Sequence, residues 1–209
     1  MYSWRIPAGC LFVALFCSVH SIAQAPPAAP TTNPTYTPIT GKQRIDWAVK
    51  STIGVKSLAV AGVISAGWGT IFNEPPEYGT QFDGFAKRYG MRLTGVATGN
   101  SMEASLGMVW GEDPRYFRAP EEKFWGRVGN AMDLTVRARG ADGKYHLAYA
   151  RYAGTTGNNF LSNTWRVDSE NDVGDALSRT AAGFAGKLAS NLFDEFWPDV
   201  RKKLKGLKF

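Results

Sequence analysis

The chain begins its regular pattern with a long run of apolar residues spaced three and four apart, which is the period of an amphipathic helix. This run predicts a helix from about Gly41 to Phe72. Thr40 and Gln43 form a capping-box pattern at its start, in which each side chain satisfies a backbone N–H of the other. The prolines in the segment 73–76 are expected to end it.

The same reasoning predicts the elements that follow. They are a helix from Glu77 or Tyr78 to about Trp110, a third helix over roughly 120–136, a hairpin formed by 134–139 and 144–148 around a turn at 140–143, a short helix within 148–165, and a last long helix from Ser169 or Asp172 to Trp197. Pro198 is expected to kink or end the last helix. The predicted fold class is all-α, a bundle of three to five helices with one short β-hairpin.

Three of the long helices carry rows of small residues at a spacing of four. The rows are Ser57, Ala61, Ser65 and Gly69; Gly95, Gly99, Gly107 and Gly111, with Glu103 in the missing place; and Ser178, Ala182, Gly186 and Ser190. Bulky rows lie beside two of them: Val60, Ile64, Trp68 and Phe72, and Phe184, Leu188, Leu192 and Phe196. Each helical glycine costs about 1 kcal/mol relative to alanine, so close backbone approach between helices is the expected compensation. The small rows are predicted to meet, with the bulky rows filling the space between.

Small-residue rows are also typical of helices that cross a membrane. The apolar run Ser57–Phe72 has only 16 residues, whereas a bilayer needs about 20. The second helix carries Arg92 and Glu103 within its apolar part, and a charge near a bilayer centre costs roughly 3 kcal/mol. A bundle that is soluble or lies against a membrane is therefore favoured, and spanning helices remain the alternative.

The first residues resemble a secretory signal, because Arg5 precedes the apolar stretch Ala8–Val19. Cleavage is predicted after Ala23, which gives a signal peptide over 1–23. Five prolines in 24–40 predict a disordered tether, followed by a single helical domain over 41–209. An exported protein of the periplasm or outer envelope is expected.

Composition excludes several kinds of chemistry from the predicted mature chain. Cys10 and Cys17 both lie in the signal, and His146 is the single remaining histidine, expected on the surface or in the hairpin. Thiol and histidine-based catalytic or metal sites are therefore not expected, and neither is a cofactor or a nucleic-acid partner. The net charge, +6 for the whole chain, suits an anionic membrane surface or lipid as partner, as do the tail lysines. Partner proteins and self-association stay open.

Two groups of polar residues are candidate sites. Around the helix ends, five charged residues could form a polar cluster: Glu74, Glu77, Glu112, Asp113 and Arg115. Arg115 is expected to pair with Glu112 or Glu74. In the glycine row, Glu103 needs a partner when buried, and Lys187 is predicted to form that ion pair. No catalytic residue is assigned.

Four blocks together resemble an uncharacterised family of bacterial exported proteins. They are 73–79 (NEPPEYG), 87–90 (KRYG), 112–117 (EDPRYF) and 195–200 (EFWPDV), and the resemblance covers roughly 73–204. It implies export and a bacterial origin, and it supplies no activity, cofactor or catalytic residue.

Three functions are consistent with these patterns. The first is a non-enzymatic cell-envelope protein with a structural or assembly role, its helical bundle lying against a membrane. The second is a carrier or binding module for an apolar ligand or lipid between helices. The third is an enzyme of unknown type that uses Glu112, Asp113 and Arg115.

Overall fold

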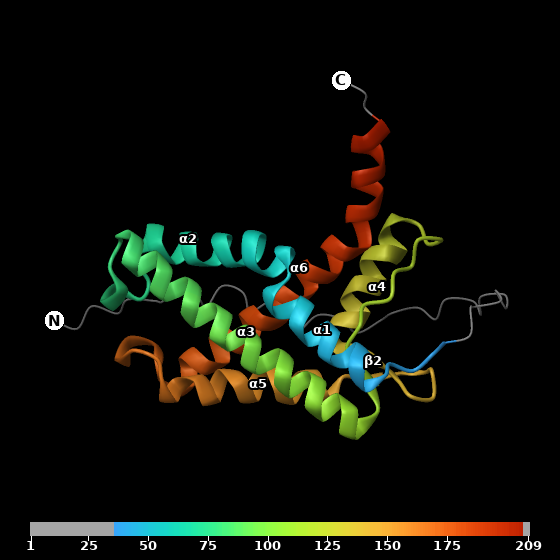
Figure 1. Ribbon diagram of the computed structural model, residues 1–209, viewed down its shortest axis with the longest axis horizontal. Helices are drawn as coiled ribbons and strands as arrows, with labels where there is room; N and C mark the ends of the chain where they lie inside the picture. The colour runs from blue at the N-terminus through green and yellow to red at the C-terminus, as the bar shows by residue number, and fades with distance from the viewer. Residues whose placement is uncertain (1–35, 207–209) are drawn as a thin grey trace. The chain divides into compact units, whose positions relative to one another are not determined.

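The computed structural model describes residues 36–206 and is mostly helical. The predicted signal 1–23 and most of the predicted tether 24–40 lie outside the described residues. The helices are α1 (Gly41–Ile53), α2 (Val63–Phe72), α3 (Phe82–Trp110), α4 (Phe124–Val136), α5 (Tyr149–Leu161) and α6 (Val173–Gly206), and the strands are β1 (Glu112–Asp113), β2 (Arg137–Gly140) and β3 (Tyr145–Leu147). Figure 1 shows α3 with α2 on one side and α5 on the other, and it packs against both. The predicted helical bundle is confirmed.

The first predicted helix, from Gly41 to Phe72, is nearly continuous and contains a π-helical segment at Lys56–Gly62. Its capping box is present: Gln43 N donates to Thr40 Oγ1, and Thr40 N donates to Gln43 Oε1. A π segment widens the helix and disturbs its backbone bonding. The α3 side chains Tyr89 and Arg92 donate to the carbonyls of residues 58 and 57 there, at 3.1 and 3.3 Å.

The second long helix begins at Phe82, four residues later than the latest predicted start. The preceding loop contains a short 3₁₀ turn at Pro76–Tyr78 and is organised by the buried guanidinium of Arg88. Arg88 donates to the backbone carbonyls of Glu74, Pro75 and Gly79 at 2.6–2.8 Å. The loop carbonyls therefore accept from the Arg88 side chain, and these residues do not form the first turn of the helix.

The predicted hairpin is present and belongs to a three-stranded antiparallel sheet in the order β1-β2-β3. Residues Glu112–Asp113, which follow the predicted second long helix, form β1 and pair with β2. A two-residue strand has no periodicity, so the pattern could not reveal it. His146 lies exposed in β3 beside Asp142, as the sequence predicted for a hairpin residue.

The glycine row of α3 makes the close contact that its sequence predicts, against α5. A Cβ on Gly154 of α5 would lie 3.1 Å from the carbonyl oxygen of Gly99 and 3.0 Å from the backbone nitrogen of Glu103. Gly95 and Gly99 both face the side chain of Asn158. The two backbones therefore touch where the side chains are smallest.

The predicted small row of α6 does not behave in this way. Ser178, Ala182 and Gly186 are exposed, and a Cβ on Gly186 would meet nothing within 4 Å. The bulky row of α6 is half-buried instead: Phe184 contacts Tyr152, and Phe196 contacts Phe124. The prediction that this small row packs against another helix is wrong for these three residues, because the large side chains occupy the inner face. Ser190, the last member of the row, is half-buried and accepts from Lys56 Nζ at 2.8 Å.

The bulky row of the first helix is also placed opposite to its prediction. Val60, Ile64, Trp68 and Phe72 are 44–66% exposed, so they fill no space between helices. The inner face of this stretch consists instead of small residues, with Ser57, Gly62 and Ala66 buried.

Pro198 lies inside α6, which continues to Gly206 instead of ending at Trp197. Figure 1 shows the last turns of α6, in red, leading away from the other helices. A proline removes one backbone donor and bends a helix without ending it where other contacts hold the chain.

Candidate functional site

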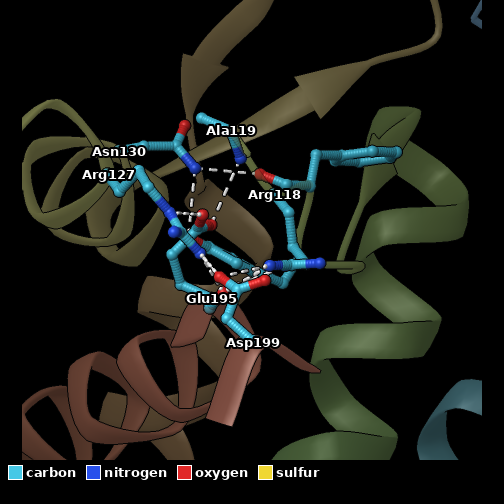
Figure 2. A network of polar contacts seen from close by, with 8 residues as sticks. Arg118, Ala119, Arg127, Asn130, Glu195 and Asp199 are labelled. Atoms are coloured by element: carbon cyan, nitrogen blue, oxygen red, sulfur yellow. Dashed lines mark hydrogen bonds and ion pairs between the residues drawn. The ribbon is translucent and has the colours of Figure 1, made fainter. Parts of the chain in front are cut away.

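A buried carboxylate on α6, Glu195, organises the most extensive polar network in the described part of the chain (Figure 2). Its side chain is 0% exposed. Tyr116 Oη donates to Glu195 Oε2 at 2.7 Å, and the backbone N–H of Ala119 donates to the same oxygen at 3.2 Å. Arg127 of α4 donates from Nε to Oε1 at 2.8 Å.

Two arginines extend this network to the turn of α6 that contains Pro198. Arg118 and Arg127 both donate to the backbone carbonyl of Glu195 and to the carboxylate of Asp199. Figure 2 shows both guanidiniums beside Asp199. We call Tyr116, Arg118, Ala119, Arg127, Asn130, Glu195 and Asp199 the Glu195 network. Two cations face two anions in it, so its charges balance.

The network holds its carboxylates in the ionised form. Burial alone would raise the pKa of Glu195, but the hydrogen bonds from Tyr116, Arg127 and Ala119 outweigh burial and lower the pKa. The hydrogen bond from Arg127 lowers the pKa of Asp199. Burial and the hydrogen bond to Glu195 raise the pKa of Tyr116 well above its ordinary value. The carboxylates stay ionised and the Tyr116 hydroxyl stays protonated, so each acceptor keeps its donor. This favours a structural role over proton transfer.

The Glu195 network joins two of the sequence blocks that the resemblance singled out. Tyr116 lies in the block 112–117, while Glu195 and Asp199 lie in the block 195–200. The sequence did not reveal this pairing. One signal could have found it: Glu195 follows Leu188 by seven positions and Leu192 by three, so it falls on the inward face of α6.

Glu103 in the glycine row is buried and paired, but with Arg151 of α5 instead of Lys187. Arg151 Nε donates to Glu103 Oε1 at 2.9 Å. Its Nη1 donates to the carbonyls of Leu134, Thr135 and Arg137, where α4 ends. The predicted partner was wrong because α5 packs on α3 and brings Arg151 to Glu103, while α6 packs on α4 and α5.

Lys187 is half-buried, and its Nζ lies 5.6 Å from the ring centroid of Trp47. Burial lowers the pKa of its amine to about 8, and the nearby cations Arg151 and Lys56 act in the same direction. Glu103 is close enough for its charge to oppose this shift. Within the described residues Lys187 forms no ion pair, so it carries a poorly compensated charge.

The five residues of the predicted polar cluster do not come together. Glu77 precedes α3 and Glu112 follows it, and a helix of 29 residues is about 43 Å long. At the first end, the Glu77 side chain accepts from Ser169 Oγ, while Glu74 contributes its backbone carbonyl to Arg88.

At the second end of α3, Arg115 and Asp113 form a pair, and Glu112 has a separate role. Arg115 pairs with buried Asp113, at 2.6 Å from Nη2 to Oδ2, instead of with Glu112 or Glu74. Glu112 accepts from the backbone N–H groups of Tyr149 and Ala150, at the start of α5. Burial raises the pKa of Glu112. The space between Glu103 and Glu112 is too small for a water molecule, so the two carboxylates do not flank a substrate pocket.

In the described chain the largest fully buried side chains are polar, and many large apolar side chains are exposed. The largest fully buried side chains are Glu195, Asn191, Asp113 and Ser162, whereas the buried apolar residues are one leucine and six alanines. By contrast, Trp68 is 66% exposed, Trp125 77% and Phe82 82%. Tryptophan in water-soluble proteins is highly buried on average, so this distribution is inverted.

An exposed apolar surface follows α2 and the end of the π-helical segment before it. We define the α2 outer face as the exposed residues Val60, Val63, Ile64, Trp68, Ile71 and Phe72. Trp68 and Phe72 contact each other, with ring centroids 4.6 Å apart. The stretch Gly41–Phe72 is long and apolar enough to cross a membrane, and only 17% of its most apolar window is buried. Most of this surface therefore has no protein partner within the described chain.

A shallow groove of about 560 Å³ follows one side of α3. It is lined by small and apolar residues, namely Ala97, Thr98, Ser101, Met102, Ser105 and Leu106. No charged side chain lines it.

Neither a scan against protein-family models nor searches of curated proteins and solved structures found a match to this chain.

Proposed function

We propose that this chain is a non-enzymatic protein of the bacterial cell envelope, exported to the periplasm or outer envelope, whose helical bundle lies against a membrane. Its role is structural. One observation carries the proposal: the largest fully buried side chains are polar, while Trp68, Ile71 and Phe72 are more than half exposed. Contiguous exposed apolar surface is typical of sites that contact lipid or protein.

Lipid is favoured as the contact because of the aromatic content of the exposed surface. Tryptophans concentrate where a membrane meets water, since the ring is apolar and the N–H needs a polar partner. Trp68, Trp110, Trp125 and Trp197 are all more than 40% exposed.

The length of the α2 outer face favours lying on the membrane over crossing it. Charges interrupt the helical stretch up to Lys56, and the uncharged run Ser57–Phe72 has 16 residues. Such a run is about 24 Å long, shorter than a hydrocarbon core of about 30 Å. The face is therefore expected to enter the headgroup and upper acyl region only.

The structural role is supported by the way the buried charges are used. Glu195 is held by Tyr116 and Arg127, and Glu103 is held by Arg151. Each carboxylate joins different segments of the chain, and the space beside Glu103 is too small for a water molecule. Such pairs favour one arrangement of the helices.

Flotation of the purified protein with phosphatidylcholine vesicles tests this proposal. We expect the protein to float, and a variant with Ile64→Ser, Trp68→Ser and Ile71→Ser to bind at least about tenfold more weakly, because full burial of a large apolar side chain contributes about 1.5–3 kcal/mol. The matched control carries Met132→Ser, Leu147→Ser and Leu161→Ser, at exposed positions on other elements. A protein that stays unbound, or two variants that lose binding equally, would contradict the proposal.

The α3 groove supports a second candidate, a carrier for an apolar ligand or lipid. An open groove of about 560 Å³ without charged lining residues suits an acyl chain. Native mass spectrometry of the protein, with Ser101→Trp as the variant that fills the groove, distinguishes the two. A lipid that co-purifies with the native chain and is lost in the variant would favour the carrier.

A further inference from the structure

The last turns of α6 form an amphipathic segment that extends past Pro198. Phe193, Trp197, Val200 and Leu204 follow one another at spacings of four, three and four, so they share one face. All four are exposed, by 36–54%, and the rings of Phe193 and Trp197 are stacked 5.1 Å apart. We call the segment Phe193–Gly206 the C-terminal arm.

The acidic residues of the arm are already engaged by cations from other elements. Asp194 binds Lys56 at 2.7 Å, and Glu195 binds Arg127 at 2.8 Å. Asp199 binds Arg127 and Arg118. None of them is left to neutralise the residues that follow.

Four cations come after these acids: Arg201, Lys202, Lys203 and Lys205. All four are exposed, and none forms an ion pair within residues 36–206. By helical spacing, Arg201 and Lys205 border the apolar face on one side and Lys203 borders it on the other. The arm therefore combines an exposed apolar stripe with excess positive charge at its edges.

We propose that the C-terminal arm binds the surface of a membrane that contains anionic phospholipids. Lysine and arginine at the edges of an apolar stripe contact lipid phosphates while the stripe enters the acyl boundary. The inference rests on the proposed membrane contact and adds a lipid class to it. The α2 outer face has no charge and binds lipid irrespective of headgroup, whereas the arm selects negatively charged headgroups.

The arm adds a second contact site to the α2 outer face. A single interfacial segment of a few turns gives weak, reversible binding, and stable attachment generally needs two signals. The α2 outer face supplies the apolar signal, and the arm supplies the electrostatic one.

Flotation with two kinds of vesicle separates the two contacts. One kind contains phosphatidylcholine alone, and the other contains about one third phosphatidylglycerol, which gives a negative surface. The full chain is compared with a variant carrying Arg201→Gln, Lys203→Gln and Lys205→Gln, and with a control carrying Lys42→Gln, Lys50→Gln and Lys144→Gln at exposed positions elsewhere.

We expect the arm variant to lose at least about tenfold in binding to anionic vesicles, since each basic residue contributes up to about fivefold. Its binding to neutral vesicles should not change, and the control should behave like the unmodified chain on both. Added salt should weaken binding of the unmodified chain to anionic vesicles and have much less effect on the arm variant.

A second pair of variants tests the apolar stripe. Val200→Ser with Leu204→Ser should weaken binding to anionic vesicles, whereas Val173→Ser with Leu177→Ser, at the other end of α6, should not.

Different failures have different meanings. Equal binding of the arm variant and its control to anionic vesicles would overturn the role of the arm, while binding to neutral vesicles would still support the α2 outer face. Failure of the unmodified chain to bind neutral vesicles would count against the proposed function itself. Binding of soluble polyglutamate as tightly as anionic vesicles would assign the arm to an acidic protein and overturn the lipid inference.

Discussion

The Glu195 network and the α2 outer face show opposite relations between residue type and exposure. At Glu195, a carboxylate is fully buried and bound by cations from two other segments. On α2, Trp68 and Ile71 are 66% and 78% exposed. In water, burial of apolar surface is the main drive for folding, and polar groups are mostly outside. The comparison indicates a chain whose inside is fixed by polar contacts and whose outside presents apolar side chains, which the proposed function places against lipid.

The largest expected effect comes from breaking the polar side of this comparison. Glu195→Ala removes one of the two carboxylates that Arg127 binds and takes the acceptor away from the Tyr116 hydroxyl. Removing one partner of a buried pair costs up to about 3–5 kcal/mol. We expect a large fall in Tm, measured by circular dichroism in detergent. Glu121→Ala, at an exposed position outside the network, should change stability by less than about 0.5 kcal/mol. Equal Tm values for the two variants would show that the network does not stabilise the fold.

A smaller effect is expected at the contact between α3 and α5. A Cβ at Gly154 would lie 3.0 Å from a backbone atom of α3, so Gly154→Ala forces the helices apart and costs about 1–3 kcal/mol. Gly186→Ala meets open space and should stabilise α6 by up to about 1 kcal/mol. Chemical unfolding of the two variants measures the difference. The same sign of change in both would contradict the packing of the glycine row.

The smallest effect is expected at Lys187, a half-buried cation that forms no ion pair within the described residues. The pKa of its amine is lowered to about 8, so the unfolded chain binds this proton more tightly than the folded one. Below pH 8 the charge therefore opposes folding, and this penalty disappears as the pH rises from 8 towards the ordinary lysine value.

Lys187→Met should accordingly raise stability by about 1 kcal/mol at pH 7, discounted for partial exposure. The gain should shrink above pH 8. Unfolding curves at pH 7 and pH 10 measure it, and a gain that does not depend on pH would contradict the assigned cause.

Much of the fold could be predicted from local pattern, because the responsible contacts are local. The capping box at Thr40, the end of the first helix at Asn73 and the hairpin all depend on residues within a few positions of one another. The start of α3 was missed because Arg88, several residues inside the helix, fixes the loop before it.

Which side of a helix faces inward could not be predicted in the same way. The rows of α3 and α6 look alike, yet the first touches α5 and three of the four residues of the second are exposed. A spacing of four shows that residues share one face of a helix, but it does not show whether that face is buried or exposed. The usual rule that bulky residues point inward fails on α2. The pairing of Glu103 depended on which helices are neighbours, and that is a property of the whole fold.

The central claim is that the α2 outer face contacts lipid, and site-directed spin labelling tests it most directly. With Cys10 and Cys17 replaced by serine, a nitroxide is attached at Ile64→Cys and, as control, at Lys144→Cys in the hairpin turn. In phosphatidylcholine vesicles the label at 64 should collide readily with oxygen and poorly with a water-soluble nickel chelate, while the label at 144 should show the reverse. Equal, water-like accessibility at both positions would contradict the account.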